Sequence, residues 1–264
     1  MTGTPRLAFG ITAADRPDHV RLGADLERLG YDELWANDTR AGDGLATLTA
    51  AAVETTSLGF GVGVIALSEQ HPPQIADRLA GSGLPIARLV LGVGSGSSAS
   101  LQLVRDGVAE MRRLVPGVSI GMAAIGPRMA HLAGEIADVV IANWAVPERL
   151  AWVRGHVAEG ATDAGRPEPR FVAYVRTAVG PDAAGRLQAE MDRYRGYGAY
   201  YARAFEAQPP GLIGVAGSGQ REVVAGIAAY AAIADTTVVR GLPADDSVDA
   251  WLTVARAAAY ALPA

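Results

Sequence analysis

The chain has 264 residues, of which 50% are hydrophobic and 19% charged, so it can form one large domain spanning residues 1–264. The absence of cysteine and lysine excludes thiolate catalysis, cysteine metal sites and lysine Schiff bases, and a net charge of −5 disfavours nucleic-acid binding. The histidines lack metal-ligand spacing, and no apolar run resembles a signal peptide or a membrane span, so we expect a cytoplasmic, metal-free protein without membrane contact.

Eight short apolar runs bounded by turn residues predict buried strands. They cover residues 6–12, 33–37, 58–67, 88–93, 118–124, 138–142, 171–179 and 236–240. Helical stripes, proline starts and glycine stops predict intervening helices at 18–29, 44–55, 72–80, 100–114, 127–134, 147–161, 183–205, 220–232 and 248–259. This alternation is typical of a (β/α)8 TIM barrel. The rival, a doubly wound sheet, would carry a glycine-rich loop after the first strand, where residues 13–17 contain no glycine.

Two glycine patterns mark where something can approach the backbone closely. Gly59, Gly61 and Gly63 alternate along one face of the third strand, so a flat group, either backbone or ligand, should lie against that face. The fourth strand runs into a loop of glycines at 92, 94 and 96 with serines at 95, 97 and 98. Such a loop either admits a flat or phosphorylated ligand or makes a tight turn into the next helix.

Catalytic residues of a barrel lie at the C-terminal ends of its strands. Asp38, after the second strand, is a candidate general base or ring anchor, or a helix cap. Glu69 and His71 follow the third strand and are a candidate acid–base pair, although His71 precedes two prolines and is more simply read as a cap. Gly126-Pro127 begins a helix whose free amides, with Arg128, favour a phosphate, or it is a plain helix start.

The later strand ends offer fewer polar groups. Asn143 and Trp144 follow the sixth strand, where Trp144 either walls a ring pocket or packs at the rim. Arg176 lies in the seventh strand and points either at a phosphate or at solvent. Tyrosines at 194, 197, 200, 201 and 230 indicate packing or a subunit interface.

Four segments together resemble the bacterial luciferase-like monooxygenase superfamily, in particular its branch that depends on coenzyme F420, a deazaflavin. They are residues 29–35 (LGYDELW), 58–64 (LGFGVGV) followed by His71-Pro72, 88–94 (RLVLGVG), and 126–134 (GPRMAHLAG) with Ala137-Asp138 behind it. The chain is shorter than most members, which implies shortened insertions around the mouth and a more open site, or one completed by a partner subunit.

The resemblance implies a deazaflavin or FMN across the barrel mouth, a cis peptide bond at Gly63–Val64, and an oxidoreductase that acts on a small organic substrate, as a homodimer. We predict Asp38 as the catalytic residue. The predicted cofactor-binding residues are Gly63, Val64, Gly92, Gly94, Ser95, Gly96, Gly126, Pro127, Arg128 and Asn143. The predicted substrate-binding residues are Thr39, His71, Trp144 and Arg176.

Two positions depart from the family pattern. Thr39 stands where the deazaflavin dehydrogenases usually carry a histidine, and Ser97 where they often carry a glutamate. Alcohol or sugar-phosphate dehydrogenation is therefore not the expected reaction. Three hypotheses follow: deazaflavin-dependent hydride transfer, an FMN-dependent monooxygenase, or a degenerate barrel that binds a flavin-like ligand or a partner without turnover.

Overall fold

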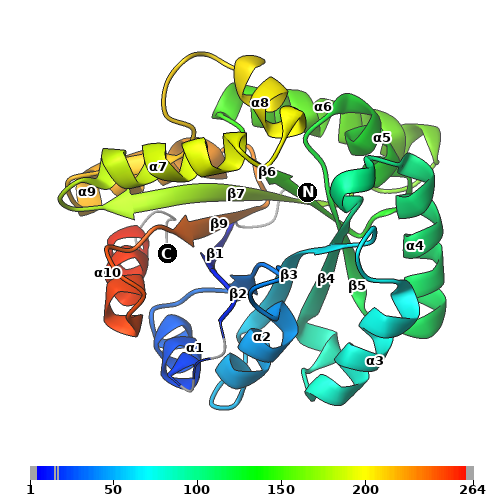
Figure 1. Cartoon of the computed structure of the whole chain (residues 1–264), viewed down its shortest axis with the longest axis horizontal. Helices are drawn as coiled ribbons and strands as arrows, with labels where there is room; N and C mark the ends of the chain where they lie inside the picture. Colours follow the sequence, from blue (N-terminus) through cyan, green and yellow to red (C-terminus); the bar gives the residue numbers. More distant parts are fainter. Residues whose placement is uncertain (1–4, 15, 17, 260–264) are drawn as a thin grey trace.

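A closed ring of parallel strands forms the centre of the computed structural model, which describes residues 5–14, 16 and 18–259 (Figure 1). The ring runs β1–β2–β3–β4–β5–β6–β7–β9 and closes where β9 pairs with β1. Its strands are β1 (Arg6–Ile11), β2 (Glu33–Ala36), β3 (Gly59–Ala66), β4 (Leu89–Gly94), β5 (Ser119–Ala123), β6 (Val139–Asn143), β7 (Arg170–Val179) and β9 (Thr236–Gly241). The predicted (β/α)8 barrel is confirmed.

A ninth strand, which the sequence did not reveal, lies outside the ring. It is β8 (Val215–Gly217), which pairs with the last residues of β7, Thr177–Val179. The three residues of this strand carry too little periodic pattern to predict it from the sequence. β8 therefore extends the sheet past the barrel mouth on one side only.

The helices surround the ring on the outside (Figure 1). They are α1 (His19–Arg28), α2 (Gly44–Ala52), α3 (Pro72–Ser82), α4 (Leu101–Leu114), α5 (Pro127–Ile136), α6 (Pro147–Asp163), α7 (Ala183–Arg195), α8 (Ala199–Glu206), α9 (Gln220–Ala231) and α10 (Val248–Ala258). The single helix predicted over 183–205 is wrong, because the chain breaks into α7 and α8. Gly198 there has φ = 136°, a conformation that L side chains rarely adopt.

Apolar side chains form an inner and an outer core. The outer core lies between the strands and the helices, and the inner core fills the barrel with small branched residues around Trp35 and Tyr174. Trp35 is fully buried, and its ring meets that of Tyr174 edge-on at 5.8 Å between centroids. The interior of the barrel is thus a packed core, and a ligand can approach at the C-terminal end of the strands.

A charged cluster closes the opposite, N-terminal end of the barrel. Glu33 on β2 accepts hydrogen bonds from Arg170 on β7 at 2.6 Å and from the Trp35 indole at 2.8 Å. Arg6 on β1 completes the cluster with a 3.0 Å ion pair to the same carboxylate. Because the Glu33 side chain is only 4% exposed, these partners stabilise a charge that would otherwise be costly to bury.

Glu27 of α1 holds the turn before β3 and should make stability depend on pH. Its carboxylate accepts from the Ser57 hydroxyl at 2.7 Å and from the amides of Ser57 and Leu58 at 2.6 and 2.8 Å. These hydrogen bonds lower the pKa of Glu27 to about 2. The Ser57 hydroxyl makes the largest contribution, and the backbone amides add to it. A lowered folded-state pKa contributes stability above the unfolded value, near 4.5, that is lost as pH falls toward 2.

We therefore expect Glu27→Gln to lower the free energy of unfolding at pH 7 by on the order of 1 kcal/mol, after allowance for solvent screening. The difference from the wild type should shrink between pH 4.5 and pH 2. Urea unfolding at pH 7 and pH 3 measures this, with Glu110→Gln as the control because Glu110 makes only a 3.5 Å ion pair with Arg113. An equal deficit at both pH values would contradict the assignment.

Candidate functional site

The predicted site residues lie at the C-terminal end of the ring, on several different strands. Asp38 follows β2, Gly63 and Val64 lie in β3, Asn143 ends β6, and Arg176 lies in β7. Because all strands of the ring are parallel, these ends meet at one mouth.

The peptide bond between Gly63 and Val64 is cis, where the family resemblance places it. The pairing of β3 with β4 shifts between Val62 and Ile65, so β3 bulges at this bond. Val62 and Ile65 are buried, whereas Gly63 and Val64 are half-buried at the mouth. The bulge therefore presents a short stretch of β3 to whatever enters the barrel.

The flat groups against the β3 glycines belong to the protein itself. A Cβ on Gly61 would overlap the Trp35 ring, and one on Gly63 would lie 2.8 Å from the Tyr174 hydroxyl. The sequence predicted backbone or a ligand at this face, whereas along Gly61 and Gly63 the flat groups are two aromatic side chains. Of these glycines, Gly63 lies closest to the mouth and keeps partial exposure.

The loop after β4 combines packing glycines with an exposed tip. Gly92 is buried, and a Cβ there would overlap the Val62 carbonyl, so close packing against the bulge accounts for this glycine. Gly94 is also buried, and a Cβ there would lie 3.1 Å from Val64. Of the predicted binding residues in this loop, the half-buried Ser95 and the exposed Gly96 are the ones open to a ligand.

The tip of this loop lies against the end of β3. Gly96 has φ = 62°, and a side chain there would overlap the Ser68 hydroxyl. The same hydroxyl accepts from the Ser97 amide at 3.2 Å. Ser97 is exposed and stands where the family often carries a glutamate, so this position presents a hydroxyl in place of a carboxylate.

Asp38 is anchored in a polar network at the end of β2. Its side chain is 3% exposed and accepts from the Gly44 amide at 3.0 Å, from Gln70 Nε2 at 2.9 Å and from Arg78 Nη2 at 2.8 Å. Arg78 also pairs with Asp43, the N-cap of α2, at 2.7 Å. The network ties α2 and α3 to β2, and the sequence did not connect Gln70 or Arg78 with Asp38 because only the fold brings them together.

The other candidates near β3 separate in the structure. Glu69 accepts two hydrogen bonds from Arg40, at 3.1 and 3.2 Å, so its partner is Arg40 and not His71. His71 is exposed and is the N-cap of α3, where its amide donates to Gln74 at 3.0 Å, which fits the cap interpretation. Thr39 is exposed beside Asp38 and lines a pocket of 210 Å³ that Arg40 and Glu69 also line.

Arg176 points neither at solvent nor along the surface. It is 3% exposed, donates to Asn143 Oδ1, and donates to the Tyr194 hydroxyl at 3.0 Å. Its guanidinium lies 4.2 Å from the centre of the Trp144 ring, which itself packs on Tyr194 and on Phe205. Trp144 therefore packs at the rim and supports Arg176, while Asn143 and Tyr194 separate the guanidinium from solvent.

Sequence reasoning missed three further groups at the mouth. Arg240 on β9 is buried beside Arg176, and Tyr174 and Tyr194 lie beneath and above this pair. A usable signal was present, because Arg240, like Arg176, is a charged residue near the C-terminal end of its strand. Burial raises the pKa of the Tyr174 hydroxyl, which stays protonated and can only donate or accept as a neutral group.

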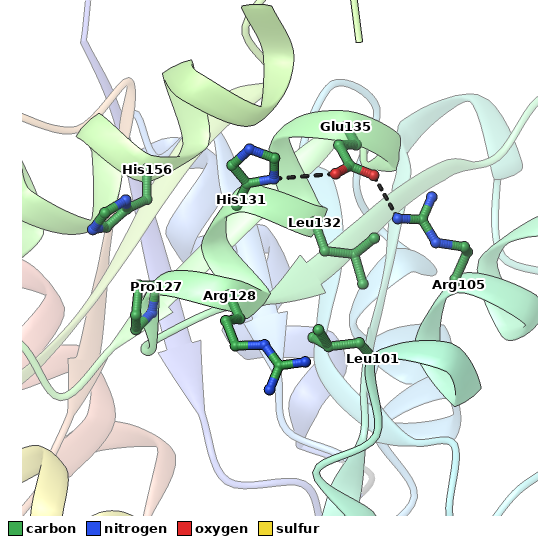
Figure 2. A pocket seen from close by; sticks show the side chains of 8 residues that line it. All are labelled: Leu101, Arg105, Pro127, Arg128, His131, Leu132, Glu135 and His156. Carbon is green, nitrogen blue, oxygen red and sulfur yellow. Dashed lines mark hydrogen bonds and ion pairs between the residues drawn. The ribbon is translucent and has the colours of Figure 1, made fainter. Parts of the chain in front are cut away.

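The start of α5 borders a groove on the outside of the barrel (Figure 2). The groove has a volume of 360 Å³ and is lined by Leu101, Arg105, Pro127, Arg128, His131, Leu132, Glu135 and His156. Arg105 and His131 both bind Glu135, whereas Arg128 extends away from them (Figure 2). Gly126 is the N-cap without a side-chain bond, and within the described residues Arg128 has no hydrogen-bond partner.

The mouth thus carries a half-buried apolar stretch on β3 and several buried hydrogen-bond donors on β6, β7 and β9. This arrangement can hold a flat ring and a polar partner, and chemistry at such a site is usually supplied by a cofactor. Across residues 5–14, 16 and 18–259, no cluster of three or more His, Asp or Glu side chains could hold a metal ion. In the same part of the chain, no helix is long and apolar enough to span a membrane.

Comparison with known proteins gives consistent matches along the chain. The family model for luciferase-like monooxygenase matches residues 4–115 and 110–237. A 5,10-methylenetetrahydromethanopterin reductase from Methanolobus tindarius is 27% identical over 197 residues, 60% of each chain. The chain therefore matches about 60% of the length of its curated relatives.

Solved structures share the fold at low sequence identity. An F420-dependent secondary alcohol dehydrogenase, in complex with an F420–acetone adduct, has a TM-score of 0.79 at 16% identity and covers 99% of this chain and 100% of that chain. The FMN complex of the oxygenating constituent of 3,6-diketocamphane monooxygenase from Pseudomonas putida has a TM-score of 0.68 at 14% identity, over 97% and 98% of the two chains.

Proposed function

Because the chain belongs to the luciferase-like monooxygenase family, we propose that it is an oxidoreductase that uses coenzyme F420 for hydride transfer to or from a small organic substrate. The bulged strand at Gly63–Val64, which opens onto the mouth, is the observation that carries this proposal. The solved alcohol dehydrogenase with bound F420 adduct adds support, since it shares this fold over 99% of the chain with a TM-score of 0.79.

The mouth fits a flat ring of this class. Gly63, Val64 and Ala66 are half-buried on β3 and form an apolar support for one face of a ring. The Tyr174 hydroxyl beside Gly63 is buried and has no hydrogen-bond partner within the described residues. A ring that carries carbonyl oxygens would supply the acceptor that this donor lacks.

The predicted site residues that are not fully buried can be assigned binding roles in this proposal. Gly63 and Val64 would support the ring, Ser95 and Gly96 would border it, and Asn143 would contact its far edge. The amides at the start of α5, with Arg128, would hold the cofactor phosphate, because a helix N-terminus attracts anions. When bound, the deazaflavin supplies the hydride chemistry, and the protein supplies position and exclusion of water. Asp38 is our candidate for proton handling, and Thr39 and His71 would meet substrate at the open side.

Titration of the purified chain with F420 and with FMN, followed by cofactor fluorescence, tests the proposal. We expect saturable F420 binding that Arg128→Gln weakens by about tenfold, through loss of a charge-assisted contact to the phosphate. Arg113→Gln is the matched control because Arg113 is exposed in the last turn of α4, at the end of the barrel opposite the mouth. No saturable binding of either cofactor would contradict an oxidoreductase of this class.

Tighter binding of FMN, with oxygen consumption in the presence of a flavin reductase, would favour the second candidate, an FMN-dependent monooxygenase. The FMN complex among the structural neighbours is the observation that keeps this candidate. Binding of either cofactor without substrate-dependent change in its absorbance, across a panel of alcohols, aldehydes and imines, would indicate a degenerate barrel.

We also propose a homodimer, supported by aromatic side chains that α6 to α8 leave exposed. Tyr197 and Tyr200 are 59% and 47% exposed, and Trp152 is 38% exposed. Large exposed aromatic groups are enriched at protein interfaces. Analytical ultracentrifugation of the wild type and of Tyr197→Ser tests this, and a monomer in both samples would contradict it.

A further inference from the structure

Two buried arginines stand side by side in the mouth. Arg176 on β7 and Arg240 on β9 are register partners on adjacent parallel strands. Tyr174 and Val238, two residues earlier on the same strands, both belong to the inner core, so the two arginines also point into the barrel. Their exposed fractions are only 3% and 5%.

Neither guanidinium has an anionic partner among the described residues. Arg176 donates to Asn143 and Tyr194, and Arg240 donates to Thr12 Oγ1 and the Gly241 carbonyl, both at 2.6 Å. All of these acceptors are neutral. Burial and the charge of Arg176 lower the pKa of Arg240, which shows that the two groups oppose each other.

One carboxylate acts on this pair from α7, but it is already bound. Glu190 lies close enough for its charge to act on Arg240. Both of its oxygens accept from Arg193, at 2.6 to 2.8 Å. The described part of the mouth therefore keeps two buried positive charges in excess, an arrangement that is costly unless an anion joins it.

Unused hydrogen-bond donors surround the pair. Arg176 Nε and Trp144 Nε1 are buried without a hydrogen-bond partner in the described structure. Both are donors, so what the site lacks is a group rich in acceptors. Carboxylates and phosphates are such groups, and guanidinium binds both through paired hydrogen bonds.

The ring order places this site across the mouth from the proposed cofactor support. From β3 the ring reaches β7 after four steps in either direction, through β4, β5 and β6 or through β2, β1 and β9. A ring supported on Gly63–Val64 would thus have the arginines on the opposite side, where a substrate would lie. The cofactor's own phosphate has a separate candidate site at Arg128.

We propose that Arg176 and Arg240 bind a carboxylate or phosphate group of the substrate, so that the enzyme acts on small organic anions. The statement that the bound anion is a substrate rests on the proposed oxidoreductase function. The binding of an anion at the two arginines does not depend on that function. Thr12 is exposed and Asn143 and Tyr194 are half-buried, so the route from solvent to the guanidinium groups passes these three side chains.

Isothermal titration of the cofactor-free wild type with inorganic phosphate, in chloride at matched ionic strength, tests the site. We expect Arg240→Gln and Arg176→Gln each to weaken phosphate binding at least tenfold, and Arg240→Lys, which keeps the charge, to weaken it less. Arg113→Gln should bind as the wild type does, because Arg113 lies in the last turn of α4, at the end of the barrel opposite the mouth. Unchanged affinity in both glutamine variants, or a loss confined to Arg128→Gln, would overturn the proposal.

A second measurement uses only the wild type and one conservative variant, in case the glutamine variants do not fold. The Nε–H resonance that is missing in Arg176→Lys is assigned to Arg176 and followed in the wild type during a phosphate titration. We expect a saturable shift, because this donor has no partner in the described structure. A resonance that does not move would overturn the proposal.

Titration of the same variants with F420 distinguishes the proposed function from the anion site. It also shows whether the anion belongs to the substrate or to the cofactor. F420 should bind Arg240→Gln as tightly as it binds the wild type, because its phosphate is assigned to α5. Tenfold weaker F420 binding by Arg240→Gln would show that the arginines bind the cofactor's anionic tail, and it would overturn the substrate assignment. Phosphate binding at the arginines without F420 binding would sink the proposed function and leave the anion site standing.

Discussion

Replacing Trp35 with alanine should lower the free energy of unfolding by about 3–5 kcal/mol, the usual cost of emptying a large buried aromatic site. Trp35 fills the barrel over Gly61, meets Tyr174 edge-on and donates to Glu33 at 2.8 Å. The strands around it form a closed hydrogen-bonded ring, which limits how far the structure can collapse into the cavity.

Urea unfolding followed by far-ultraviolet circular dichroism measures this effect without relying on tryptophan fluorescence. Ile86→Ala is the control, because Ile86 is a large apolar side chain that is 40% exposed and lies outside the inner core. We expect that control to stay within about 0.5 kcal/mol of the wild type. Equal losses in the two variants would mean that Trp35 is not the centre of the inner core.

Replacing Arg78 with methionine should cost about 3 kcal/mol, near the lower end of the range for breaking a buried ion pair. The change leaves the Asp38 carboxylate buried without its cation, while Gln70 and the Gly44 amide remain. Arg78 is 27% exposed, which keeps the loss from being larger. The pairing of Arg78 with Asp43 is more exposed and adds little.

A double-mutant cycle with Asp38→Asn identifies the source of the loss. The double variant should be more stable than Arg78→Met alone, because no uncompensated charge is then buried. Additive losses would show that Arg78 acts through other contacts.

Asp38→Asn alone also tests proton handling. A catalytic Asp38 predicts a loss of about 10²–10⁴ in kcat with an altered pH profile, and an anchoring Asp38 predicts neither.

Local pattern was enough to predict the eight strands of the ring, because each is an apolar run between turn residues. The break between α7 and α8 was not predicted, because the residues on both sides continue the helical pattern and only the conformation of Gly198 interrupts it. The short strand β8 was missed for the opposite reason, since it offers almost no pattern.

The site was predictable where one segment forms it and unpredictable where distant segments meet. The cis bond at Gly63–Val64 followed from one motif and its family resemblance. The partners of Asp38 required the placement of α3, and the pairing of Arg176 with Arg240 required the register of β7 against β9. The flat groups at Gly61 and Gly63 required knowing that Trp35 and Tyr174 face inward.

The charged cluster at the base of the barrel has a consequence for redesign of this protein. Glu33 joins β2 to β1 and, past β9, to β7, so that a single carboxylate braces an arc of four strands. That brace lies at the end opposite the mouth. Loops at the mouth are therefore the part of the barrel to lengthen or exchange in a redesign, with Glu33 and its two arginines left intact so that the brace is kept.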